Sequence, residues 1–436
     1  MQNQNREKTI VVFVKEHLLI GGIETYVYQI AKKLKSEGTQ VVWAKKKWSK
    51  IDPSFKSEFF DQKTILMDGL DCKKMAELVA DSQTRIKIVT FDLYYFAVAE
   101  KFKRDFNICP VDTFYFVSHY RGDTLYIQDS YKGKKSNQVK LEVGKIIRKM
   151  NENSNIKYFA CKHIERMTDD YDFQISDQIS QLIPPAFSTD SDFDKNRCIE
   201  LAKRDRFNIL TVSRLEFPHK GYVLGLIKAY ASLKEKYPNI ELTIIGYGSR
   251  ENEVKAKISE LPSNIAKDVH FVGKTAPEKL KEYYDDANIN ISLAGCFSQG
   301  ARNGTLSIPA RHHNYDCEVY GFLPESKPFS LSEAPGEPVI PYIEQVLNMT
   351  AEEYCEKCRA CFYAYNNDAD KQRLDFYQIQ NVSNSTLSSK EMRYLFRKKE
   401  RILRRRPRLK DVIGVFRREG IIKPVIRRIK KTFKKK

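Results

Sequence analysis

The sequence predicts an α/β protein made of two nucleotide-binding halves with parallel sheets, and two strand-to-helix corners carry this prediction. In the first corner, the strand-like residues 9–14 lead to Gly21-Gly22 and an amphipathic stretch. In the second, residues 207–212 lead through Arg214 and Lys220 into another amphipathic stretch. A buried parallel strand that feeds a helix N-terminus points backbone N–H groups outward, which suits a pyrophosphate. Two such corners indicate two halves of this kind.

Strand-like and helix-like periods alternate along the first half, which favours a parallel sheet. Its remaining candidate strands are residues 40–44, 86–91, 113–118 and 156–161. The helix after Gly22 is expected to end near Gly38, because glycine commonly follows a helix C-terminus. The pair Pro184-Pro185 closes this half, so we expect a first domain over residues 1–185.

The alternation starts again at residue 206 and is more regular. Candidate strands cover residues 209–213, 241–246, 269–273 and 289–293, and they predict a second domain over residues 186–345. The strand signal disappears after Pro341, and Thr350 and Glu353 have the spacing of a helix capping box. We therefore expect a helical segment over residues 346–386 and a basic helical C-terminal tail over residues 387–436.

Size and composition indicate a protein of two or three domains with ordinary cores, since the chain has 436 residues, of which 42% are hydrophobic. No stretch reaches the roughly 18 to 20 apolar residues that cross a bilayer, and the polar residues 1–6 lack an apolar signal core. The nine scattered cysteines indicate reduced thiols rather than a disulfide framework. We expect a cytoplasmic protein.

The net charge of +19 is concentrated in the tail. Residues 390–436 hold 21 Lys+Arg against four acidic residues, so they carry +17 and the first 389 residues carry only +2. A protein that binds nucleic acid over its whole surface would be basic throughout, whereas this body is nearly neutral. The tail therefore needs a separate explanation.

Two candidate helices in the tail each keep an apolar face, and they are separated by Pro407 and Gly420. The apolar residues are Met392, Leu395, Phe396, Ile402 and Leu403, then Ile421, Ile422, Val425, Ile426, Ile429 and Phe433. Basic amphipathic helices of this kind bind anionic membrane surfaces. Nucleic-acid tails more often mix charge with Gly, Ser and aromatic residues, and a merely solvated tail would not keep an apolar stripe. We expect residues 390–436 to bind an anionic membrane surface, and we expect no nucleic-acid partner.

With both corners placed, the chain resembles the two-domain GT-B glycosyltransferases, most closely those of glycosyltransferase family 4, over residues 9–345. The matching stretches occur in the family's order: Gly21-Gly22-Ile23-Glu24, His119 after residues 113–118, Leu182-Ile183-Pro184-Pro185, Ser213-Arg214 through Lys220-Gly221, Ile244-Ile245-Gly246-Tyr247-Gly248 and Val269-His270-Phe271-Val272-Gly273. The resemblance implies two Rossmann-like domains that face a cleft, with residues 346–386 packing back toward the first, acceptor-side domain.

The resemblance also implies transfer of a sugar from a nucleotide-sugar, with Arg214 and Lys220 on the donor diphosphate. The reaction chemistry favours cations at the same place, because negative charge grows on the leaving phosphate and fixed cations stabilise this transition state. By resemblance the reaction retains anomeric configuration and uses no protein nucleophile and no metal. The nucleotide-sugar is a substrate, so we expect no cofactor.

The family usually carries two glutamates separated by seven residues, one facing the donor sugar and one the ribose hydroxyls. Matching Gly304 to the glycine after that motif places Gln299 at the second glutamate and leaves no counterpart of the first. An amide still accepts a hydrogen bond from a hydroxyl, without the charge-assisted strength of a carboxylate. We expect Gln299 and Gly304 beside the donor. The alternative is a catalytically inactive GT-B scaffold or binding protein in a glycan-assembly complex.

The remaining candidates compete with structural roles. Gly21 and Gly22 bring the backbone close to the donor or form a plain turn, and Gly246 and Gly248 face the nucleoside or form a tight turn. His119 contacts the sugar or the acceptor, or it is a core histidine. Cys355, Cys358 and Cys361 fit one face of a buried helix better than a metal site, since no fourth thiolate lies close by. His312-His313 indicates a polar active-site loop.

The leading hypothesis is a glycosyltransferase of the hexosyltransferase type, peripheral on the inner face of the cell membrane. It would extend a surface polysaccharide or another lipid-linked glycan. Its partners would be a nucleotide-sugar donor, a glycan or lipid-linked glycan acceptor and the membrane, and lipid linkage would explain the tail.

Overall fold

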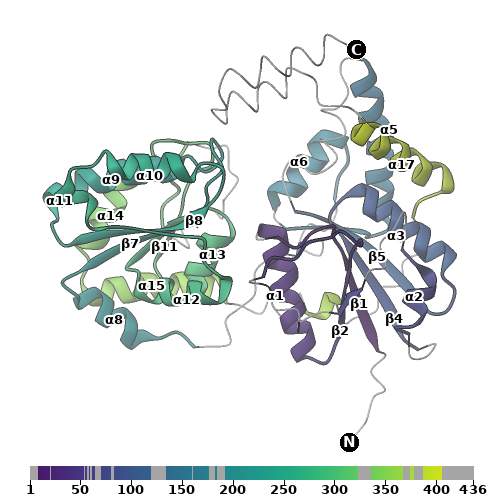
Figure 1. Ribbon diagram of the computed structural model, residues 1–436, viewed down its shortest axis with the longest axis horizontal. Coiled ribbons are helices and arrows are strands. Elements are labelled where there is room, and N and C mark those ends of the chain that lie inside the picture. Colours follow the sequence, from purple (N-terminus) through teal and green to yellow (C-terminus); the bar gives the residue numbers. More distant parts are fainter. Residues whose placement is uncertain are drawn as a thin grey trace, which may run out of the picture.

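The computed structural model contains two α/β domains, each built on a parallel sheet (Figure 1). It describes residues 8–19, 21–53, 55, 58, 61–63, 70–79, 83–118, 134–159, 161–175, 182–183, 192–322, 335–366, 374–377 and 386–404. His119 and the expected boundary after Pro185 lie outside these residues. The two parallel sheets confirm the fold class that the sequence predicts.

The first domain has a six-stranded parallel sheet in the order β3-β2-β1-β4-β5-β6. Its strands are β1 (Thr9–Val14), β2 (Gln40–Ala44), β3 (Asp61–Lys63), β4 (Arg85–Thr90), β5 (Val111–Val117) and β6 (Ile156–Tyr158). The helices are α1 (Gly22–Ser36), α2 (Cys72–Ala76), α3 (Leu93–Asp105), α5 (Lys134–Glu152) and α6 (Cys161–Tyr171). In a sheet of this order the chain reverses direction between β1 and β4, and ligands bind at the carboxyl ends of the strands there.

The second domain has a five-stranded parallel sheet in the order β11-β10-β7-β8-β9. Its strands are β7 (Phe207–Arg214), β8 (Ile240–Tyr247), β9 (Val269–Gly273), β10 (Ile289–Ser292) and β11 (Ser307–Pro309). Its helices are α8 (Lys195–Lys203), α9 (Tyr222–Lys236), α10 (Glu251–Ser259), α11 (Ser263–Ala266), η2 (Pro277–Lys279), α12 (Leu280–Asp286), α13 (Gly295–Arg302), α14 (Val339–Leu347) and α15 (Ala351–Tyr365), and a short antiparallel ribbon joins β12 (Glu318–Val319) to β13 (Glu337–Pro338).

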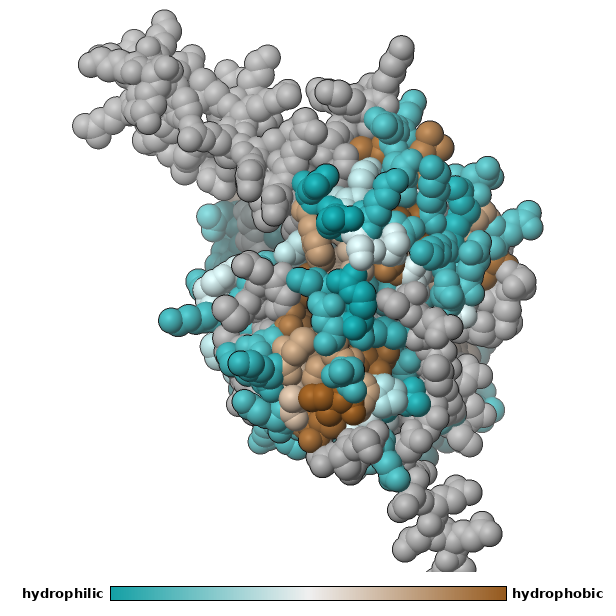
Figure 2. Space-filling view, turned by 90° about the vertical axis from the view of Figure 1, so that its right-hand side faces the viewer, coloured by the Kyte–Doolittle hydropathy of each residue, from teal (hydrophilic) through white to brown (hydrophobic). Residues whose placement is uncertain are grey.

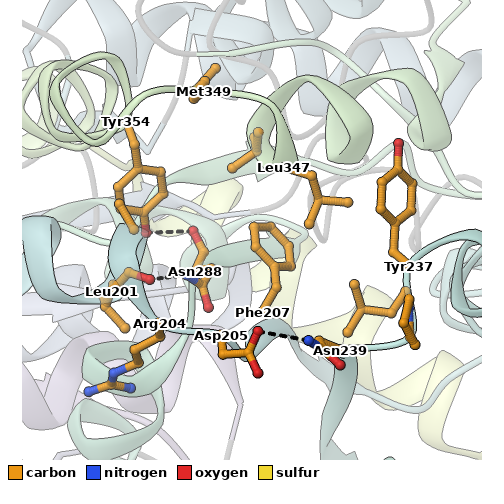
Figure 3. A pocket seen from close by; sticks show the side chains of 14 residues that line it. Leu201, Arg204, Asp205, Phe207, Tyr237, Asn239, Asn288, Leu347, Met349 and Tyr354 are labelled. Carbon is orange, nitrogen blue, oxygen red and sulfur yellow. Dashed lines mark hydrogen bonds between the residues drawn. The ribbon is translucent and has the colours of Figure 1, made fainter.

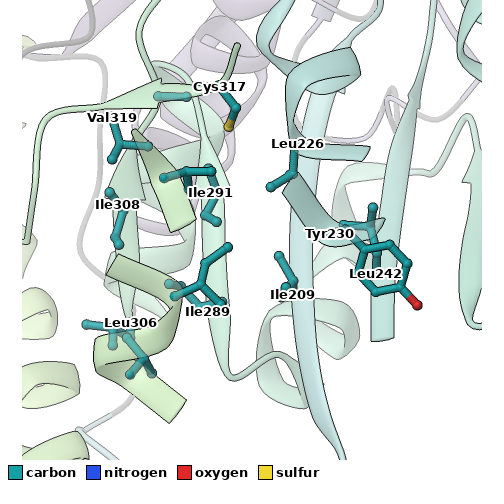
Figure 4. Packing of buried hydrophobic residues seen from close by; sticks show 14 of the residues in the cluster. Ile209, Leu226, Tyr230, Leu242, Ile289, Ile291, Leu306, Ile308, Cys317 and Val319 are labelled. Carbon is teal, nitrogen blue, oxygen red and sulfur yellow. The ribbon is translucent and has the colours of Figure 1, made fainter. Parts of the chain in front are cut away.

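The core of the second domain lies between its sheet and the covering helices. Figure 4 shows Ile209 and Leu242 of the central strands beside Leu226 and Tyr230 of α9, and all four are buried. Because helices cover both faces, β7, β8 and β10 are buried along nearly their whole length, whereas the edge strand β9 alternates between more and less buried residues. The order of this sheet reverses between β7 and β10, so the carboxyl ends of these two strands are its ligand-binding edge.

Residues 346–386 do not pack toward the first domain as a whole, which corrects the expectation. Helix α15 stays on the second domain, where Cys355, Cys358 and Cys361 are buried in the same core as Cys198 of α8. The chain has returned to the first domain at residues 374–377 (Figure 1), where Phe376 and Tyr377 are buried among aromatic residues. The apolar cysteine face of α15 completes the second core, and burial there keeps the helix on that domain.

The first tail helix also differs from the expectation. Helix α17 (Ser389–Arg404) contacts α3, and its Met392 and Leu395 are each only 2% exposed. The ring of Phe396 lies 5.6 Å from that of Tyr94, and Glu391 pairs with Lys149 of α5 at 3.1 Å. Three residues of the predicted membrane-facing stripe, Met392, Leu395 and Phe396, therefore pack on the first domain, because that domain offers α17 an apolar surface to cover. The side chains of Ile402 and Leu403 lie outside the described part.

Hydrophilic residues dominate the upper part of the first domain's outer face, where α5 and α17 lie (Figure 2). Residues 405–436, with the second candidate tail helix, lie outside the described residues. Among the helices of the described part, none is both long and apolar enough to span a bilayer.

Candidate active site

The candidate site lies at the carboxyl ends of β7 and β10, where the second sheet reverses its strand order. Strand β7 ends at Arg214 and leads through Lys220 to α9, and β10 ends at Ser292 and leads to α13. Ala294 has a φ of 57° directly before α13, a left-handed conformation that few non-glycine residues adopt. The sharp turn lets α13 start at this edge, with its first N–H groups free of intrahelical acceptors.

Lys220 is the central cation of the site. Burial, together with the charge of Arg214, lowers the pKa of its ammonium to about 8, while Cys296 at the start of α13 has the opposite influence. Burial raises the pKa of the Cys296 thiol, and nearby Lys220 opposes this shift. No carboxylate forms an ion pair with Lys220 within the described part of the chain. A cation held here without a counter-ion favours binding of an anion.

Arg214 and Gly21 meet across the junction between the domains. Arg214 is exposed, and its Nε lies 3.8 Å from a carboxylate oxygen of Glu216, which is a weak contact. A Cβ atom added to Gly21 would lie 3.8 Å from Nη1 of Arg214. The same Cβ would lie 2.5 Å from the carboxylate of Glu24, whose other oxygen pairs with Lys15 at 3.3 Å. The two strand-to-helix corners that the sequence singled out are therefore neighbours in space.

Two polar contacts join the domains beside these corners. The ammonium of Lys274, after β9, pairs with the buried Asp52 of the first domain at 2.7 Å. The hydroxyl of Tyr28 on α1 donates a hydrogen bond to Glu278 at 2.7 Å. Tyr247 at the end of β8 lies under Lys274, whose Nζ is 5.6 Å from the ring centre. These contacts hold the ligand-binding edges of the two sheets against each other.

Gly246 and Gly248 have packing roles in this structure. A Cβ on Gly246 would lie 2.0 Å from the carbonyl oxygen of Ser213, its partner on β7. Gly248 has a φ of +156°, and a Cβ there would lie 2.5 Å from the carbonyl oxygen of Leu215. Any side chain at Gly246 would push β8 from β7, so close strand packing explains this glycine, and the positive φ directly after β8 explains Gly248. A contact of either glycine with the nucleoside stays a prediction.

Gln299 and Gly304, which the resemblance to the family places together beside the donor, face different surroundings in the structure. Gly304 has a φ of +72° just past the helix end, and a Cβ on it would lie 2.9 Å from Nη2 of Arg197, against α8 rather than the domain junction. The positive φ directly after the helix C-terminus explains why this position is a glycine. Gln299 is partly buried one turn after Cys296, on nearly the same helical face. Its proximity to a donor ribose stays a prediction.

A histidine cluster beside Lys220 was only partly foreseen. Nδ1 of His219 lies 3.2 Å from Nε2 of His313, and the backbone N–H of His313 donates to the His219 carbonyl. The rings of His219 and His312 lie 5.8 Å apart. The sequence indicated a polar loop at 312–313, but the separation of 94 residues from His219 concealed this pairing. Among the described residues, no group of three His, Cys, Asp or Glu residues is arranged to hold a metal ion.

A cavity of about 240 Å³ lies elsewhere, at the amino ends of β7 and β8. Figure 3 shows Phe207, Tyr237 and Tyr354 around it, with Tyr354 hydrogen-bonded to the Asn288 carbonyl and Asp205 to Asn239. The eight residues of β7 separate this cavity from Arg214 by about 23 Å. The cavity is therefore not part of the candidate site.

Comparisons with known proteins agree with the sequence motifs. Residues 192–295 match the family model described as "Glycosyl transferases group 1". No curated protein sequence matches the chain significantly.

Among solved structures, TarM from S. aureus is 13% identical with a TM-score of 0.43, covering 71% of this chain and 58% of its own, so the chain spans less than two thirds of that protein. WaaG, a glycosyltransferase involved in lipopolysaccharide biosynthesis, is 15% identical with a TM-score of 0.44, covering 88% of this chain and 99% of its own. A glycosyltransferase from Rickettsia africae is 14% identical with a TM-score of 0.45, covering 92% and 100%. The family match to residues 192–295 confirms the resemblance to glycosyltransferases that the motifs indicate, and it includes Arg214 and Lys220.

Proposed function

We propose that the chain transfers a sugar from a nucleotide-sugar to a glycan acceptor, with Lys220 and Arg214 binding the donor diphosphate. The observation that carries this proposal is the meeting of Lys220, Arg214 and the N-terminus of α13 at the reversal point of the second sheet. The family match over the same residues supports it.

The cations suit a leaving diphosphate because they are held in place before the reaction. Lys220 is kept by the fold at a site where burial disfavours its charge. The leaving phosphate gains negative charge in the transition state, and this charge stabilises the Lys220 ammonium that burial disfavours. The interaction is therefore stronger in the transition state than with the intact donor. The α13 N-terminus adds backbone N–H groups and the positive end of the helix dipole.

Gly21 completes the arrangement from the first domain. Its backbone lies next to Arg214, so a donor held by Arg214 would also lie against the α1 N-terminus. A hydroxyl of an acceptor bound to the first domain would then approach the sugar from that side. We propose that the leaving phosphate accepts the proton of this hydroxyl, which gives retention without a protein nucleophile or a metal ion.

We also propose that the acceptor is lipid-linked and that the protein works at the cytoplasmic face of the membrane. The support is the tail, where residues 405–436 hold 14 Lys+Arg and two acidic residues. Each basic residue near an anionic surface contributes on the order of 1 kcal/mol to binding. Since α17 is docked on the first domain, such a tail would hold the acceptor side of the protein near lipid.

The test is to incubate the protein with a panel of nucleotide-sugars and to measure nucleotide release, with Arg214→Ala as the variant. We expect release from one donor and its loss in the variant. If no donor is hydrolysed but one nucleotide-sugar still binds, the chain is the inactive scaffold, an alternative that Gln299 in place of a glutamate favours. If neither hydrolysis nor binding occurs, the proposed function is wrong.

A further inference from the structure

Trp48 is an exposed aromatic residue in a loop of lysines. The loop after β2 reads Lys45-Lys46-Lys47-Trp48-Ser49-Lys50, and the Trp48 side chain is 57% exposed. The chain's other tryptophan, Trp43, is 1% exposed and donates its indole N–H to the Lys15 carbonyl. A single exposed apolar side chain is ordinary, so what distinguishes Trp48 is its position among four lysines of the same loop.

The loop holds the Trp48 ring in place. The ring lies 5.2 Å from that of His17, whose Nδ1 accepts a hydrogen bond from the Lys50 backbone. The Lys46 ammonium lies 5.1 Å from the Trp48 ring centre and pairs with Glu16 at 2.8 Å. Trp48 is therefore an exposed aromatic surface whose ring packs at a tilt against His17, with the Lys46 ammonium beside it.

The loop also lies at the domain junction. Its end is tied to the segment after β1 by backbone hydrogen bonds between Leu18 and both Lys50 and Asp52. Asp52, four residues after Trp48, pairs with Lys274 of the second domain. Four residues span at most about 14 Å, so Trp48 lies on the rim of the junction, on the first-domain side. An acceptor that reaches the donor from the first domain would pass this rim.

We propose that the Trp48 loop binds an acidic oligosaccharide, with the indole ring stacked on a sugar ring and the lysines paired with its carboxylate or phosphate groups. Aromatic rings supply large apolar contact areas at little conformational cost. Lys47 and Lys50 are exposed beside the ring, and Asp52 is already paired, so the loop presents positive charge. This inference rests on the proposed function for one point: the bound glycan is the acceptor.

An anionic membrane is the competing partner for a loop of lysines and tryptophan. The structure favours the glycan, because the ring is held against His17 at the edge of the junction, while the strongly basic tail at residues 405–436 is available for lipid.

The test uses the full chain on an array of hexasaccharides: hyaluronan and phosphomannan fragments as acidic probes, chitohexaose and maltohexaose as neutral ones. Wild-type protein, Trp48→Ala and Tyr363→Ala are compared, because Tyr363 on α15 is also exposed, at 58%, and lies on the other domain. We expect an acidic probe to bind and to shift tryptophan emission to the blue. We expect Trp48→Ala to weaken binding at least about tenfold and Tyr363→Ala to change it less than about twofold. Circular dichroism checks that both variants are folded.

Three results would overturn the inference: no acidic probe bound, equal binding by Trp48→Ala, or a blue shift with phosphatidylglycerol vesicles and none with glycans. Nucleotide release from the donor panel is measured on the same samples. Glycan binding through Trp48 without donor hydrolysis would refute the proposed function and the acceptor role of the glycan, and it would leave the glycan-binding site standing. Hydrolysis retained in Trp48→Ala, with transfer to the glycan lost, would support both.

Discussion

Lys220 offers the sharpest test of the diphosphate site, because its charge should control activity within an accessible pH range. Its pKa is lowered to about 8 by burial and by the charge of Arg214. The protonated form binds the leaving phosphate, so kcat/KM for the donor should be constant below pH 7 and fall above pH 8. At pH 9 about one tenth of the free protein keeps this proton, which predicts roughly a tenfold loss.

Removing the Lys220 ammonium should lower kcat/KM more than its deprotonation at pH 9 does. Lys220→Ala should lower kcat/KM by roughly 30- to 800-fold at pH 7, equivalent to about 2 to 4 kcal/mol of barrier. Lys220→Arg keeps a charge whose pKa exceeds 12, so its alkaline loss should disappear even if its rate is lower. Lys228→Ala, which changes an exposed lysine on α9, is the matched control and should behave as wild type.

The same lowered pKa predicts that the charged Lys220 side chain, which supports activity, reduces the stability of the folded protein. The folded protein releases the Lys220 proton near pH 8 and the unfolded chain near 10.5, so the unfolded state binds more protons between these values. The free energy of unfolding therefore rises with pH across this window. Lys220→Met should raise it at pH 7 by up to about 3 kcal/mol, since each pKa unit corresponds to about 1.4 kcal/mol. The gain should fade as pH approaches 10.5.

Steady-state kinetics with a confirmed donor from pH 6 to 9.5, and urea unfolding at pH 7 and 10, measure these effects. A pH profile of wild-type kcat/KM that stays flat to pH 9.5, together with Lys220→Ala within about threefold of wild type, would refute the diphosphate assignment. Loss of activity in Lys220→Ala with a parallel loss of stability would show that Lys220 supports folding rather than catalysis.

Gln299→Glu should leave transfer intact or tighten donor binding, because it restores a charge-assisted acceptor for a ribose hydroxyl. Calorimetric titration with the donor measures the affinity. A donor-bound structure with Gln299 far from the ribose would contradict this prediction. Gly246→Ala should destabilise the protein by at least about 2 kcal/mol, since the new Cβ would lie 2.0 Å from a backbone oxygen, whereas Gly295→Ala, with no atom within 4 Å of its Cβ, should change the free energy of unfolding by less than about 1 kcal/mol. Truncation before residue 405 should release the protein from anionic vesicles in co-sedimentation and leave its melting temperature unchanged, whereas truncation before residue 389 should also lower the melting temperature, because α17 covers part of the first core. Equal sedimentation of the full chain and the shorter tail variant would exclude the tail as an anchor.

Local sequence periodicity determined the two parallel sheets and the place of Arg214 and Lys220 between strand and helix. An apolar run such as β1, which is buried along nearly its whole length, is typical of a parallel sheet covered by helices on both faces, so its alternation with helical periods indicates the architecture. A loop between such a strand and helix must lie at the ligand-binding edge, so its cations could be assigned without knowing any contact.

The tertiary structure alone decided which surface covers each amphipathic face. Helix α17 and α15 show apolar stripes in the sequence, but a stripe has the same pattern whether lipid, the first domain or the second domain covers it. The structure places α17 on the first domain and α15 on the second. Likewise the meeting of Gly21 with Arg214, and of His219 with His313, joins residues about 190 and 94 positions apart, and no local propensity encodes such distant partners because they depend on how whole domains pack.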